Sequence, residues 1–257
     1  MGYNHGYGDG YYDGYHDGYK NGLKKGGGSG GGAVLELGPG APVIPLATTE
    51  IPDNMFNADI TFSEFVSREC TKVGENAFYG HSLSSASLPA CVQVGDHAFN
   101  GCYNLSSVSL PACVQIGDYA FENCDSIPGI SLPVCTRVGE NAFGSCDGLS
   151  SVSLPACVQV GDFAFSGCYS LSSISLPSCV RVGGNAFSYC NGLSGVSLPA
   201  CTLIGEYAFD NCDSLSSVSL LSIDPADRAE AKDLCHYYGI YRSGCTVEFK
   251  RFTIVIE

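Results

Sequence analysis

The residues of this 257-residue chain with the most chemistry to offer are its fifteen cysteines. Twelve of them recur at intervals of eleven residues from Cys91 to Cys212. No Cys-x-x-Cys pair occurs, and this interval alternates between two walls of a coil, so zinc would lack a local ligand cluster. Each cysteine stands beside apolar residues, where a free thiol packs as a small hydrophobic side chain. We therefore predict buried free thiols, with scattered disulfides and a metal site as the less favoured alternatives.

The other residue types offer little catalytic chemistry. The histidines at positions 5, 16, 81, 97 and 236 form no His-Glu-x-x-His motif, and the chain has neither Gly-x-Ser-x-Gly nor a phosphate-binding loop. Serines are numerous, but they repeat at a strand-surface position without the adjacent base that a nucleophile needs. We expect no enzymatic activity, no catalytic residue, no cofactor and no metal.

The elements that position the cysteines belong to one 22-residue unit. It begins with SLPACVQVGDHAFNGCYNLSSV at residues 87–108 and is copied five more times. A fixed period with identical apolar positions is the signature of a stacked solenoid, because each unit buries its apolar face only against its neighbours. Phenylalanine marks one position per unit from Phe56 to Phe209, with a single interval of 21 residues between Phe78 and Phe99. The predicted array therefore spans residues 51–223 in about eight turns.

Each unit contains two local patterns. Val-Ser-Leu alternation predicts a short parallel strand, which proline then ends. The pattern Val-Gly-[Asp/Glu]-x-Ala-Phe predicts a glycine turn followed by a single helical turn. The acid after glycine would stabilise the N-terminus of that helical turn. The acids in question are Asp96, Asp118, Glu140, Asp162 and Glu206.

These patterns together carry a family resemblance. C-x-x-L-x-x-[IV]-x-L-P followed by [IV]-G-x-x-A-F-x-x-C resembles the BspA-type leucine-rich repeat. The resemblance implies an α/β repeat fold, a leucine-rich-repeat solenoid with parallel strands and short helical turns. It also implies a surface-exposed recognition or adhesion protein, of a kind common in host-associated microbes, some of their viruses and some protists, and it implies no catalysis.

The N-terminal region is of a different character. Residues 1–26 contain six tetrads with glycine at every fourth position, followed by a glycine-rich linker and N-terminal cap at 27–50. Six interior glycines cost an isolated helix roughly 5–6 kcal/mol, so a helix would form only against a partner. We interpret residues 1–26 first as a docking or oligomerisation segment and second as a solvated tail. Calcium binding by the aspartates is the least favoured interpretation. The predicted assembly residues are Gly6, Gly10, Gly14, Gly18, Gly22, Tyr7, Tyr11, Tyr15 and Tyr19.

The C-terminal region, residues 224–257, is predicted to cap the last turn. Residues 224–239 indicate a helix with Asp224 as N-cap, Pro225 at the first position and Gly239 as C-cap. Residues 246–257 alternate as one or two closing strands. A separate binding element is the alternative to a cap.

Charge restricts the possible partners and locations. The net charge of −14 and the absence of a basic stripe argue against binding to nucleic acid or to an anionic membrane. No apolar run is long enough for a spanning helix, and the first residues do not form a signal peptide. An extracellular or virion-surface location is expected, with a cytoplasmic one left open. The leading function is a virion-associated fibre or decoration protein that binds a host surface protein or glycan. A purely structural element and a microbial protein-binding scaffold are the alternatives.

Two sets of repeated residues are predicted to form the ligand-binding face. Serines on the outer face of the strands give a flat, uncharged, hydroxyl-rich surface. They are Ser107, Ser109, Ser131, Ser151, Ser153, Ser173, Ser175 and Ser197. Aromatic residues that vary from unit to unit are expected to anchor a partner, since such residues dominate interface energetics. They are Tyr103, Tyr119, Tyr169, Tyr189 and Tyr207.

Overall fold

The computed structural model describes residues 34–35, 44–45, 49–56 and 62–257. The tetrad segment 1–26, with all of its predicted assembly residues, lies outside the described residues, as does most of the linker 27–50. Two short strands of that linker, β1 (Val34–Leu35) and β2 (Ile44–Pro45), pair in antiparallel fashion.

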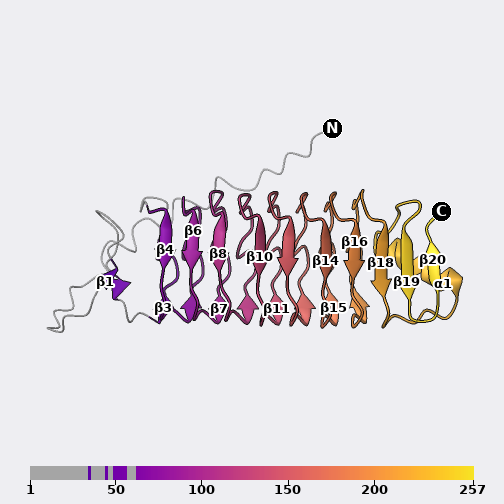
Figure 1. Ribbon diagram of the computed structural model, residues 1–257, viewed down its shortest axis with the longest axis horizontal. Helices are drawn as coiled ribbons and strands as arrows, with labels where there is room; N and C mark the ends of the chain where they lie inside the picture. The colour runs from indigo at the N-terminus through magenta and orange to yellow at the C-terminus, as the bar shows by residue number, and fades with distance from the viewer. Residues whose placement is uncertain (1–33, 36–43, 46–48, 57–61) are drawn as a thin grey trace. The chain divides into compact units, whose positions relative to one another are not determined.

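The repeats form coils that follow one another in sequence order and contribute strands to two faces (Figure 1). One face is an eight-stranded parallel sheet with one strand per coil. Its strands are β3 (Glu50–Ile51), β5 (Lys72–Val73), β7 (Gln93–Val94), β9 (Gln115–Ile116), β11 (Arg137–Val138), β13 (Gln159–Val160), β15 (Arg181–Val182) and β17 (Leu203–Ile204). This architecture confirms the predicted leucine-rich-repeat solenoid of about eight turns with parallel strands.

The second face carries the serine strands in three shorter sheets, and we call it the serine face. Its strands from the coils are β4 (Glu64–Val66), β6 (Ser85–Ser87), β8 (Ser107–Ser109), β10 (Gly129–Ser131), β12 (Ser151–Ser153), β14 (Ser173–Ser175), β16 (Gly195–Ser197) and β18 (Ser217–Leu220). Residues pair with the residue 22 positions later, as in Ser173↔Gly195. The exception is a 21-residue offset at Val73↔Val94 and Glu64↔Ser85, where the phenylalanine spacing also shortens.

A column of stacked phenylalanine rings forms the centre of the core. Neighbouring rings from Phe78 to Phe209 lie 4.8–5.7 Å apart and within 6° of parallel, and all are fully buried. From Phe78 to Phe187, the backbone amide of each ring residue donates to the alanine carbonyl of the next coil at 2.7–2.8 Å, as Phe121 N does to Ala142 O. Ring stacking and backbone hydrogen bonds thus both run from coil to coil.

The predicted single helical turn does not form in the repeats. The residue after the acid has a left-handed backbone, with φ of 58° at Tyr119 and 48° at Asn141, which no right-handed helix allows. The amide of Tyr119 donates to Glu140 O of the next coil at 2.7 Å, and the bonds within the coil are those of separate tight turns, such as Glu122 N to Tyr119 O at 3.2 Å. Within the described residues the one helix is α1 (Arg228–Tyr237).

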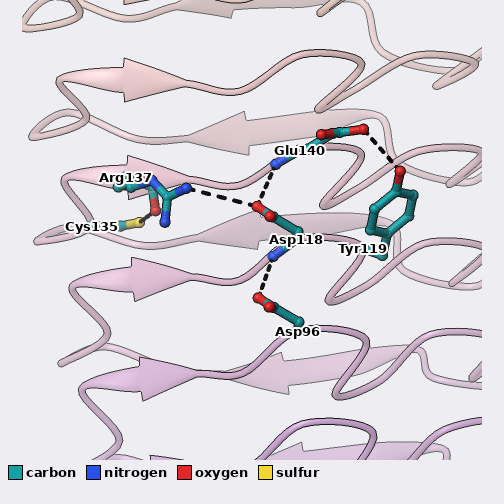
Figure 2. A network of polar contacts seen from close by, with 6 residues as sticks. All are labelled: Asp96, Asp118, Tyr119, Cys135, Arg137 and Glu140. Carbon is teal, nitrogen blue, oxygen red and sulfur yellow. Dashed lines mark hydrogen bonds and ion pairs between the residues drawn. The ribbon is translucent and has the colours of Figure 1, made fainter.

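The acid after glycine consequently has a role other than the predicted helix stabilisation. Asp118 Oδ1 accepts the backbone N–H of Glu140, and Asp96 Oδ1 accepts that of Asp118, both at 2.8 Å (Figure 2). Asp162 does the same for Gly184. The short aspartate side chain therefore joins one coil to the next.

The helix at the C-terminal end begins three residues later than predicted. Asp227, not Asp224, is the N-cap, and its carboxylate accepts from Ala229 N and Glu230 N. Asp224 instead pairs with Arg251 and with Lys250, which fixes residues 224–226 outside the helix. Tyr238 is the C-cap, and Gly239 follows it with φ of 79°.

The residues after the last coil continue its hydrogen bonding. Tyr207 N and Phe209 N donate to the carbonyls of Tyr237 and Tyr238 at 2.8 and 2.9 Å, where inner coils donate to the next coil. On the serine face, β19 (Thr246–Phe249) pairs in parallel with β18, and β20 (Thr253–Val255) adds an antiparallel edge. Of the one or two predicted closing strands, two are present, and β19 pairs with β18 as a strand of a further coil would.

Candidate functional site

The fifteen cysteines are free and buried, as predicted. In one column, from Cys70 to Cys201, each thiol donates to the carbonyl two residues later at 3.1–3.3 Å. In the other, from Cys102 to Cys212, each donates to the phenylalanine carbonyl of the preceding coil at 3.0–3.1 Å. Each thiol thus donates a hydrogen bond to a backbone carbonyl. An alanine at the same position would remove that donor.

Burial makes these thiols poor nucleophiles. It raises the pKa of Cys102 and of Cys146 to about 12 from an ordinary 9.0. A hydrogen bond from the Cys91 thiol lowers the pKa of Cys70, but that sulfur is fully buried. Within the described residues, no three or more His, Cys, Asp or Glu side chains gather as a metal site would require.

The predicted serines lie where expected, on the outer side of their strands. All are exposed except Ser197, which is half-buried. A shallow depression of about 410 Å³ lies across β14, β16, β18 and β19. Its lining combines the apolar residues Ile174, Val196 and Val218 with hydroxyl-bearing residues such as Ser173 and Ser217. Gly195 stands in the serine column between those two serines.

The predicted tyrosines lie on a different surface from the serines. They occupy the segments that lead from the eight-stranded sheet to the serine face, and we call this surface the turn edge. Its segments are 74–84, 95–106, 117–128, 139–150, 161–172, 183–194 and 205–216. The exposed fractions of Tyr103, Tyr169 and Tyr189 are 58%, 51% and 52%. The structure therefore divides the single predicted binding face into two surfaces.

Charge is distributed unevenly between the edges of the coils. Every carboxylate between residues 74 and 216 lies on the turn edge, which has no lysine or arginine. The carboxylates belong to Glu75, Asp96, Asp118, Glu122, Asp125, Glu140, Asp147, Asp162, Glu206, Asp210 and Asp213. The opposite edge of the coils is formed by the segments of the pattern Leu-Pro-x-Cys-x, such as residues 154–158. Between residues 88 and 202, this edge has no charged residue. Sequence reasoning missed these carboxylates as site residues, although their 22-residue columns were visible.

Several turn-edge aromatic residues sit in a backbone conformation that disfavours them. Tyr119, Phe163, Tyr189 and Tyr207 have φ between 55° and 58°. Asparagine, which tolerates this region, fills equivalent positions in other coils, such as Asn185. The aromatic rings are thus present in spite of the local backbone.

Polar contacts fix one of these rings (Figure 2). Tyr119 Oη donates to Glu140 Oε1 at 2.9 Å, and this bond to a carboxylate raises the pKa of Tyr119 to about 12. Beside it, Arg137 Nη2 lies 3.8 Å from Asp118 Oδ1. The turn edge therefore presents its side chains from a hydrogen-bonded frame.

Comparison with known proteins supports the resemblance found in the sequence. The family model for the BspA-type leucine-rich-repeat region matches residues 49–160 and 114–224, with six copies. This chain belongs to that family. Repeat proteins of this family are typically non-enzymatic protein-binding proteins and are often found at the cell surface.

Solved structures of bacterial leucine-rich-repeat proteins share the fold. The Treponema pallidum protein TpLRR is 26% identical with a TM-score of 0.58, over 71% of this chain and 86% of that one. A leucine-rich-repeat protein from Bacteroides ovatus is 24% identical with a TM-score of 0.51, over 72% of this chain and 61% of that one. No curated protein matches the chain. Within the described residues, no helix has the length and apolar character to cross a membrane.

Proposed function

We propose that this leucine-rich-repeat protein is a non-enzymatic recognition protein that binds a protein or glycan on a host surface through its coils. One observation carries the proposal: exposed aromatic rings occupy left-handed turn positions of the turn edge, where asparagine would fit the backbone better. Such outliers persist where the rest of the structure compensates for them and concentrate at functional sites.

The contrast between core and surface supports the same proposal. Core positions repeat in every coil, as in the phenylalanine column and the two cysteine columns. The position of Tyr103 is filled by aspartate, aspartate, tyrosine and asparagine in the following four coils. Stacking of the coils does not require the residue type at this position to change from coil to coil. Recognition of one specific partner does require different side chains at different places on the surface.

Binding of the purified protein to cells tests the proposal. The triple variant Tyr103→Ala, Tyr169→Ala, Tyr189→Ala should lose at least about ten-fold in affinity, since each truncation at an interface centre costs about 1 kcal/mol or more. A matched control with Ser107→Ala, Ser151→Ala and Ser173→Ala should bind normally. Undiminished binding by the tyrosine variant would exclude Tyr103, Tyr169 and Tyr189 as anchors. The variant Phe163→Asn, Tyr207→Asn then removes the two other exposed rings at left-handed positions, and normal binding by both variants would exclude the turn edge as the binding surface.

A second candidate is glycan binding on the serine face. The depression across β14, β16, β18 and β19 favours it, because hydroxyls and the carboxylate of Glu248 line a shallow hollow of a size suited to a sugar. Replacing Gly195 by serine puts a side chain into the hollow and should abolish retention on a glycan array. Retention by this variant would argue against the depression.

We further propose that residues 1–26 attach the coils to a larger assembly, as in a fibre or decoration protein of a virion. The succession of tetrad segment, glycine-rich linker and repeat array supports this layout. A protein that begins at Ala33 should stay folded but lose its oligomeric state or its attachment, as judged by light scattering. Detection in purified virions would support the virion role, and detection only on a microbial envelope would contradict it.

A further inference from the structure

One row of the turn edge combines aromatic and acidic side chains in consecutive coils. Tyr103, Asp125, Asp147 and Tyr169 occupy the same position of four successive repeats. Both tyrosines are more than half exposed, and both aspartates are exposed. The row thus presents two carboxylates between two large exposed rings.

Hydrogen bonds hold this row in register. Ser126 Oγ donates to Tyr103 O at 2.6 Å, Gly148 N donates to Asp125 O at 3.0 Å, and Gly192 N donates to Tyr169 O at 3.0 Å, so three of the four carbonyls of the row are tied to the next coil. Coils follow at the spacing of parallel strands, about 4.8 Å. Three such intervals make the row roughly 15 Å long, which corresponds to about five residues of an extended peptide.

The charge of the row has no counter-charge in an ion pair among the described residues. In the part of the chain that the structure describes, no Lys, Arg or His nitrogen forms an ion pair with either aspartate. Partial burial and the neighbouring charge of Asp147 raise the pKa of Asp125, which indicates repulsion between the two carboxylates. A cation placed between them would relieve this repulsion.

We propose that the row Tyr103–Asp125–Asp147–Tyr169 docks a basic, extended segment of a partner protein. An arginine or lysine of that segment pairs with Asp125 and Asp147, and flanking side chains pack on the two tyrosine rings. Arginine suits the row best, because its planar guanidinium both pairs with carboxylates and stacks on aromatic faces. The acidic turn edge around the row attracts the same partner and repels acidic ones.

This inference rests on the proposed recognition function and specifies its partner. The opposite edge also exposes apolar side chains, such as Val92 and Val158, but it has no charge that would select a partner. The serine face is nearly uncharged as well. Charge complementarity therefore favours the turn edge for a basic protein segment.

Titration of the full chain with a short oligoarginine peptide tests the inference by fluorescence anisotropy. The double variant Asp125→Asn, Asp147→Asn should bind about two- to thirty-fold more weakly, since each of two exposed ion pairs contributes about 0.2–1 kcal/mol. It should remain folded, because it removes a repulsive pair. The variant Glu64→Gln, Glu69→Gln lowers the negative charge equally but lies off the turn edge, and it should bind like the unmodified protein.

Specific outcomes would overturn the inference. Equal weakening in both double variants would mean that the peptide responds only to net charge, and no binding by the unmodified protein would exclude a basic partner. If cells still bind through the three tyrosines while oligoarginine does not bind, the recognition function stands and the basic partner is wrong. If oligoarginine binds at the aspartates while no cells bind, the docking row stands and the host-surface function is wrong.

Discussion

Raising the pH above about 9 should unfold the array, because its buried thiols resist ionisation. Seven thiols have a folded pKa of about 12, against an ordinary 9.0: Cys102, Cys113, Cys146, Cys157, Cys179, Cys212 and Cys235. A folded pKa above the unfolded one gives stability that is fully present below the unfolded pKa and is lost as the pH rises. At about pH 10 each such thiol then costs about 1.4 kcal/mol. Seven cost about 10 kcal/mol, comparable to the whole stability of a typical domain of about 5–15 kcal/mol.

Two signals followed against pH in reducing buffer test this prediction. Thiolate absorbance and the loss of far-ultraviolet circular dichroism should rise together in one steep transition, since the thiols ionise only on unfolding. The urea midpoint should already fall between about pH 8 and pH 9.5, with a slope that reports the protons released on unfolding. Thiols that titrate near pH 9 while the circular dichroism stays native would refute the reasoning. A protein that stays folded well above pH 10 would show that the seven thiols cost less than about 10 kcal/mol of stability.

Three further changes test the core, a turn and the cap. Phe143→Ala should lower the free energy of unfolding by about 3–5 kcal/mol, because the Phe143 ring is fully buried between the rings of two neighbouring coils. Urea titration measures this loss, and Phe143→Leu is the control with a smaller expected loss. Phe163→Asn should raise the free energy of unfolding by about 0.5–1 kcal/mol, because asparagine tolerates the left-handed backbone at this position better than phenylalanine does. A decrease would contradict the claim that Phe163 is strained. Asp227→Ala should cost about 0.5–2 kcal/mol by removing the helix cap, whereas Asp227→Asn should cost less.

The stack itself could be predicted from sequence because each coil aligns identical side chains with its neighbours. The spacing of phenylalanine fixes the strand register, including the single 21-residue offset at Val73↔Val94. The free thiols follow from the same alignment, since their columns fall between apolar core residues. Periodicity thus determines the strand register and the columns of core side chains.

The turns could not be predicted in the same way, because their conformation depends on hydrogen bonds between coils. A signal was present: the left-handed positions are often asparagine or glycine, as at Asn76 and Gly101, but aromatic residues in other coils obscured it. The start of α1 was missed for a similar reason. Two aspartates, Asp224 and Asp227, precede it, and the choice between them depends on Arg251, 27 residues after the first.

The unfavourable features of the described coils occur together on one edge. Left-handed aromatic residues and adjacent like charges, as at Asp125 and Asp147, both occur on the turn edge. The opposite edge repeats Leu-Pro-x-Cys-x with no charge between residues 88 and 202, and so avoids both. The stacked rings lie in the core, and hydrogen bonds run from coil to coil at both edges, as from Val158 N to Thr136 O and from Phe143 N to Ala164 O, so stacking alone gives no reason for the difference. The proposed partner of the turn edge supplies such a reason, because its binding would favour side chains that the isolated coil disfavours.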